Sequence, residues 1–132
     1  MDLKKLLLAT VAVGVVANVL DFVFHGFVMA SRYAAIEALR TDMGVWWLVL
    51  GDFVGALVLV WVYDRVYASF GGGPRGGAIY GFYLGIAVNF PTWIFVHLLF
   101  KGFPYWLAWV WTIFGVVWSV VAGAVAGATY KK

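Results

Sequence analysis

The sequence predicts an all-α membrane protein, a bundle of four transmembrane helices that forms one domain over residues 1–132. The prediction depends on composition, on four long apolar segments and on the placement of the basic residues. The chain is 65% hydrophobic and 11% charged, with a mean hydropathy of +0.97. A soluble domain has roughly 45–50% apolar and about 25% charged residues. We therefore expect the lipid bilayer, rather than water, to surround most of this protein.

The same composition excludes several classes of function. The chain has no cysteine, so it can form neither a disulfide framework nor a thiolate metal site. Its net charge is +3, but its nine basic residues are spread thinly and form no cluster typical of a nucleic-acid-binding protein. We expect no nucleic-acid partner.

Four segments are long enough to cross a bilayer as helices, which takes about 20 predominantly apolar residues. They are approximately residues 6–29, 45–63, 78–100 and 105–130. The first begins like a signal peptide, with two lysines before an apolar run and with Ala17 at a position suited to cleavage. Its hydrophobicity continues to Val28, so we expect a retained helix.

The basic residues predict the orientation of the bundle. If the N-terminus is cytoplasmic, six basic residues lie on the cytoplasmic side and three on the outer side, which follows the positive-inside rule. The six are Lys4, Lys5, Arg65, Arg75, Lys131 and Lys132, and the three are Arg32, Arg40 and Lys101. We expect both termini to be cytoplasmic.

The three connections differ in character. Near-helical spacing of apolar residues in segment 31–44 predicts a short interfacial helix on the outer surface, between the first two spans. Segment 70–78 is rich in glycine and predicts a flexible cytoplasmic loop, without the following Lys-Ser/Thr of a phosphate loop. Segment 101–106 predicts a tight outer turn, with Gly102 ending one helix and Pro104 starting the next.

Small residues spaced four apart predict where the helices pack closely, because lipid provides no hydrophobic drive for helix association. The three sets are Gly51/Gly55 in the second span, Gly77/Gly81/Gly85 in the third and Ser119/Gly123/Gly127 in the fourth. The last two sets predict close contact of the third and fourth spans in the cytoplasmic half. We expect a tapered bundle whose cavity opens outward.

The outer half is rich in aromatic residues, most of them typical of the membrane interface. Trp93 and Trp111 lie deeper and could form a platform for a pigment, a quinone or a lipid, with Thr112 at a similar depth. These three residues are the candidate cofactor-binding residues.

The stretch NVLDFVFHGF, residues 18–27, places Asn18, Asp21 and His25 on one face of the first span. The third span carries Asn89 and His97 in the same direction, and the second carries Asp52 at a similar depth. Ionisable residues inside a membrane usually face the bundle interior and mark functional sites. We predict that Asn18 and Asn89 form hydrogen bonds between helices, as structural residues.

Four functions remain open for these polar residues, which lie at a similar depth in the membrane. His25, His97, Asp21 and Asp52 could ligate a zinc or iron ion, or the two histidines could hold haem b. An Asp and His chain could also carry protons, in an oligomer. A His–Asp pair can act as a general base, but no nucleophile motif favours an enzyme. The preferred prediction is a binding or accessory protein with an outward-facing polar pocket, in a larger membrane complex or a homo-oligomer.

The motif LDFxxHG at residues 20–26, followed by Tyr33, resembles a group of small four-helix bacterial membrane proteins of uncharacterised function. Two later stretches are similar as well: RGGAIYGFYLG at 75–85 and GAVAGATYK at 123–131. The resemblance implies four membrane helices and a bacterial inner membrane, and it brings no established activity.

Overall fold

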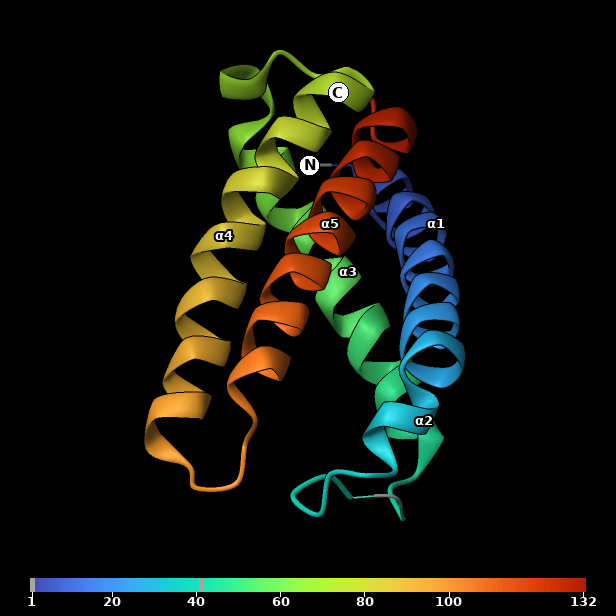
Figure 1. Ribbon diagram of the computed structural model, residues 1–132. Helices are drawn as coiled ribbons and strands as arrows, with labels where there is room; N and C mark the ends of the chain where they lie inside the picture. Colours follow the sequence, from blue (N-terminus) through green and yellow to red (C-terminus); the bar gives the residue numbers. More distant parts are fainter. Residues whose placement is uncertain (1, 41) are drawn as a thin grey trace.

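The computed structural model describes residues 2–40 and 42–132, and the regular structure of this part is entirely helical (Figure 1). Its elements in chain order are α1 (Leu3–Asp21), the π-helix η1 (Phe22–Val28), α2 (Ala30–Tyr33), α3 (Val45–Phe70), α4 (Gly73–Leu99) and α5 (Tyr105–Thr129). Since α1 continues directly into η1, the fold consists of four long helical segments and the short α2.

The four long segments are all long and apolar enough to span a membrane: Leu3–Val28, Val45–Phe70, Gly73–Leu99 and Tyr105–Thr129. The number and apolar character of the predicted spans are therefore confirmed. Two boundaries were wrong, because α3 continues past residue 63 to Phe70 and α4 begins before residue 78, at Gly73.

The predicted flexible loop over 70–78 is in fact a tight reversal. Gly71, Gly72 and Gly73 have φ angles of +78°, +65° and +67°, which residues with a Cβ rarely adopt. Three successive glycines can thus reverse the chain within a few residues. Pro74 then stands in the first turn of α4, where its missing N–H costs no hydrogen bond.

The helix predicted within 31–44 is also shorter than expected. It is limited to α2, Ala30–Tyr33, and the described residues that follow are turns held by bonds such as Ile36 N–H to Tyr33 O at 3.0 Å. Four residues make barely one helical turn, so this segment owes its position to contacts with the rest of the fold.

The long helices pack as two pairs, α4 with α5 and α1 with α3, and α1 also contacts α5. Figure 1 shows both chain ends and the α3–α4 turn at one end of the bundle, with α2 and the α4–α5 turn at the other. We call the first the terminal end, comprising residues 2–5, 71–73 and 130–132. The second is the distal end, comprising residues 29–40, 42–44 and 100–104.

Backbone contact between α4 and α5 is closest along two rows of small residues. A Cβ on Gly77 would collide with the carbonyl oxygen of Gly123, and one on Gly81 would collide with that of Ser119. Such contact lets the two helices approach until main chain meets main chain. The rows are those predicted for the third and fourth spans: Gly77, Gly81 and Gly85 against Ser119, Gly123 and Gly127.

Gly51 and Gly55 behave differently. No atom lies within 4 Å of a Cβ built on either glycine, and both are exposed on the surface of α3. The prediction that this pair packs a helix therefore fails within this chain. Instead α1 and α3 meet where the ring of Phe53 lies against Gly14.

The hydrophobic core lies in the terminal half of the bundle. Its buried residues are Leu6, Ala9, Val13, Ala56, Leu59, Val60, Tyr63, Tyr80, Ala122, Ala126 and Tyr130. The tyrosine hydroxyls in this core are satisfied by hydrogen bonds, for example Tyr80 donating to the Leu59 carbonyl at 3.0 Å. The bundle is thus densely packed near the termini.

A buried carboxylate closes the terminal end. Asp64 on α3 is only 3% exposed, and Tyr130 donates a hydrogen bond of 2.5 Å to its Oδ1. Arg65 Nη1 lies 2.8 Å from its Oδ2, and Lys132 Nζ lies 3.5 Å from its Oδ1. These contacts tie the C-terminus to α3. The sequence interpretation treated Arg65 and Lys132 only as surface charges and overlooked Asp64.

This contact predicts a stability change at alkaline pH. Burial, followed by the hydrogen bond to Asp64, raises the pKa of Tyr130 to about 12, whereas an unfolded tyrosine has a pKa of about 10. Between these values the unfolded chain loses the Tyr130 proton and the folded chain keeps it, so stability falls as the pH rises from 10 to 12. Unfolding measured against pH should show this loss in the wild type, and Tyr130→Phe should remove that part of it. An equal decline in both proteins would contradict the assignment.

Candidate functional site

A chain of hydrogen bonds joins three elements at the distal end. Trp111 Nε1 on α5 donates to Tyr33 Oη on α2 at 2.7 Å, and Tyr33 Oη lies 2.5 Å from His25 Nδ1 on η1. An indole N–H can only donate, so Tyr33 accepts from Trp111 and can give its own proton to His25. In that arrangement His25 carries its proton on Nε2, the atom that lies 3.9 Å from Asp21 Oδ1.

The π-helix η1 sets the position of His25. Its wider turn is seen in the bond from Met29 N–H to Phe24 O, five residues back, and it shifts the following side chains relative to a continuous α-helix. The His25 ring lies edge-on to Phe24 and Phe114, with centroids 5.0 Å away in each case. π-Helical turns are frequent at functional sites, and the sequence interpretation did not anticipate this one.

Below His25, two carboxyl groups meet across the α1–α3 contact. Asp21 on α1 and Asp52 on α3 lie close enough for their carboxyl groups to interact directly. The polar face predicted from NVLDFVFHGF thus extends through Asp21 to α3.

His97 supports a different segment. Its Nδ1 lies 3.0 Å from the backbone oxygen of Phe103, and because a carbonyl oxygen can only accept, Nδ1 is the donor. Its ring packs against Tyr105, with centroids 5.0 Å apart. His97 therefore fixes the turn between α4 and α5 and contacts the start of α5 at Tyr105.

The predicted metal site is not assembled in this fold. Within residues 2–40 and 42–132, no group of three or more His, Asp or Glu side chains is placed to hold a metal ion. Asp21 and Asp52 lie together beneath His25, but His97 is bound to the α4–α5 turn. His25 and His97 bond to different segments, and the described residues bring no set of four ligands together. The bis-histidine haem site stays a prediction.

The two asparagines do not form the predicted hydrogen bonds between helices. Asn18 donates to Gly14 O at 2.8 Å and Asn89 to Gly85 O at 2.9 Å, so each bonds one turn back along its own helix. Asn89 still contributes to packing, because its amide fills the space where a Cβ of Gly115 would lie.

The residues predicted to bind a cofactor are occupied by contacts within the protein. Thr112 is buried and donates to Ala108 O at 2.7 Å. Trp93 lies edge-on to Trp111, with centroids 4.6 Å apart, and Phe103 packs on Trp111 at 5.3 Å. These rings form an aromatic cluster in the distal half, and cofactor binding by it stays a prediction.

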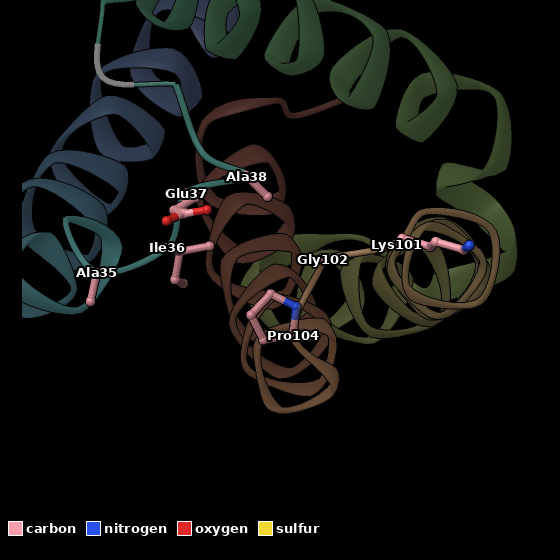
Figure 2. A pocket seen from close by; sticks show the side chains of 7 residues that line it. All are labelled: Ala35, Ile36, Glu37, Ala38, Lys101, Gly102 and Pro104. Atoms are coloured by element: carbon pink, nitrogen blue, oxygen red, sulfur yellow. The ribbon is translucent and has the colours of Figure 1, made fainter.

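An open hollow of about 530 Å³ lies at the distal end, between segment 35–38 and the α4–α5 turn. Figure 2 shows segment 35–38 on one side and Gly102 and Pro104 on the other, with the Lys101 side chain directed away from segment 35–38. The lining residues are Ala35, Ile36, Glu37, Ala38, Lys101, Gly102 and Pro104. None of them was predicted as a site residue, because each belongs to a loop whose course depends on the folded bundle.

Trp111 contacts a residue next to each wall of this hollow. Its Nε1 donates to Tyr33, which leads into segment 35–38, and its ring packs on Phe103, in the α4–α5 turn that supplies the other lining residues. Behind Trp111, His25 fixes Tyr33 and His97 fixes Phe103. The two histidines of the chain therefore each position one wall, which gives them a common structural role without direct contact.

Comparisons with protein-family models, with curated proteins and with solved structures found no match for this chain. The resemblance carried by LDFxxHG accordingly stays a prediction.

Proposed function

We propose that this is a small integral membrane protein with a binding or accessory role, and that a partner docks in the hollow at its distal end. The observation that carries this proposal is that Trp111 contacts Tyr33 and Phe103, which adjoin the two lining segments, so a defined network supports the hollow. Preorganised walls favour binding, because fewer side chains have to be ordered when the partner arrives.

The location of the hollow follows from the proposed orientation. Six basic residues against three assign the terminal end to the cytoplasm, so the distal end faces outward. The resemblance carried by LDFxxHG supports a bacterial inner membrane as its location. A partner at the hollow is then a larger membrane complex, or a second copy of this chain, on the outer side of that membrane.

The charges around the hollow indicate what such a partner presents. Glu37 and Lys101 are both exposed and stand on opposite walls. A partner surface with one basic and one acidic group complements this pair, and complementary charges give specificity and speed of association more than affinity.

One observation favours proton exchange as a second function. Asp52, Asp21, His25 and Tyr33 form a continuous polar series toward the distal end, and such series mark proton relays in membranes. The α4–α5 contact is closed by backbone on the cytoplasmic side in the proposed orientation. The series therefore supports proton exchange with the outer side only, and passage through the membrane requires an oligomer.

The partner proposal is tested by exchanging charge at the hollow. The tagged protein is purified from native membranes after mild cross-linking, and its companions are quantified by mass spectrometry. The double variant Glu37→Lys, Lys101→Glu reverses both charges, so we expect any specific partner to fall at least about tenfold, since each 1.4 kcal/mol is tenfold in affinity. Arg40→Gln removes an exposed charge at the same end and should leave the partner in place. Equal recovery from all three proteins, or isolation as a lone stable species, would overturn the proposal.

A further inference from the structure

A second hollow of about 290 Å³ lies on the membrane-facing surface between η1 and α5. Its lining is entirely apolar: Phe24, Val110, Ile113, Phe114 and Val117. Ile113 is 61% exposed and Val117 is 52% exposed, and the lining residues lie within two of the membrane spans. In a bilayer such a groove is filled by hydrocarbon chains, because no water reaches it.

The groove follows the direction of a lipid chain and ends beneath the polar network. From Val110 to Val117 the axis of α5 advances about 10 Å, and Val110 is nearer the distal end. Phe24 and Phe114 stack at 3.9 Å, and the ring of His25 contacts both of them. A chain lying in the groove would therefore carry its polar head at the level of His25 and Tyr33.

The groups at that level distinguish between head groups. His25 Nδ1 and Trp111 Nε1 are already engaged with Tyr33, so neither of these two nitrogens is free to bind a head group. Arg32, next to Tyr33, is exposed and makes no hydrogen bond or ion pair with any residue that the structure describes. An arginine with no partner favours a phosphate.

We propose that this groove, which we call the acyl groove, binds an anionic phospholipid of the leaflet at the distal end. One acyl chain lies against Ile113 and Val117, and the phosphate lies at Arg32. Exchanging one lipid for another brings no hydrophobic gain within a bilayer, so the preference comes from packing and from the arginine charge. One basic residue near the membrane surface gives a preference of about fivefold for an anionic lipid over a neutral one. This inference needs the membrane embedding but not the partner site at Glu37 and Lys101.

The head-group preference can be measured by competition. The protein is reconstituted with equal amounts of phosphatidylglycerol and phosphatidylcholine that carry identical acyl chains, and native mass spectrometry counts the lipids it retains. The wild type should retain one phosphatidylglycerol about fivefold over phosphatidylcholine. Arg32→Gln should bring the ratio close to one, and Arg40→Gln, at the same end, should leave it unchanged. No preference in the wild type, or the same preference in Arg32→Gln, would overturn the head-group assignment.

The acyl groove is tested by filling it. Ile113→Trp places a large ring in the groove, so we expect the retained lipid of either class to be lost. Val58→Trp introduces the same ring at a membrane-facing position of α3, 54% exposed in the wild type, and should retain the lipid. Val117→Ala widens the groove without adding a bulky group and should keep the wild-type lipid ratio. Loss of lipid in Ile113→Trp alone is then attributed to the filled groove and not to any change of its lining. Lipid retained by Ile113→Trp would contradict the position of the chain.

Discussion

Replacing Gly81 with alanine is expected to push α4 away from α5. Among substitutions that add a single methyl group to this protein, it should give one of the largest losses of stability. The new Cβ would collide with the backbone carbonyl of Ser119, and neither backbone can move without the whole helix. Overpacking of this kind costs typically about 1–3 kcal/mol. Alanine gains at most about 1 kcal/mol over glycine in helix propensity. Unfolding in detergent, followed by tryptophan fluorescence, measures the difference.

Gly51→Ala is the matched control for this prediction. It makes the same change in the middle of α3, where no atom lies within 4 Å of the new Cβ. Only the gain in helix propensity remains, so we expect the protein to be unchanged or more stable by up to about 1 kcal/mol. If Gly51→Ala destabilises as strongly as Gly81→Ala, then α3 packs on something outside this chain and the comparison of the two glycines fails.

Replacing Trp111 with alanine is expected to release both walls of the distal hollow. The change removes the donor to Tyr33 and the ring that packs on Phe103 and Trp93. Truncation of a well-packed tryptophan costs about 3–5 kcal/mol, and the partial exposure of Trp111 places the cost at the lower end of that range. Hydrogen exchange at the amides of residues 32–40 and 100–103 should accelerate by about two orders of magnitude.

Two further variants separate the contributions of Trp111. Trp111→Phe keeps an aromatic ring and removes the donor, so it should cost only about 1 kcal/mol and loosen segment 32–40 more than the α4–α5 turn. Trp109→Ala removes an equally large ring that contacts Phe90 and Tyr105, and it should leave the hollow intact. Equal exchange rates in Trp111→Ala and Trp109→Ala would contradict the role given to Trp111.

The polar residues illustrate how far prediction from sequence reached the candidate site. The spacing of Asp21 and His25 placed them on one face, and the structure joins that face to Asp52 and Tyr33. The sequence could not show that His25 and His97 belong to different contacts. Two residues at the same depth need not face each other, because depth leaves the rotation of each helix undetermined. His97 instead bonds to the α4–α5 turn.

Asp64 is a residue whose structural role the sequence did not reveal. In the sequence it stands beside Arg65 near the end of a span, where a charged pair is ordinary. Its burial depends on Tyr130 and Lys132, which lie more than 60 residues away in the chain and reach it only when α5 returns to the terminal end. Periodicity and composition carry no information on such a long-range contact.

The sequence alone determined the apolar surroundings that this protein needs, its four long apolar helices and the rows of small residues between the last two. Apolar length and small-residue spacing are local properties of each helix, so they can be read along the chain. Only the tertiary structure decided which polar groups meet. The π-turn of η1, the short α2 and the course of the distal loops set the geometry around Trp111, and each depends on packing between segments. The two histidines, alike in the sequence, thus position opposite walls of one hollow.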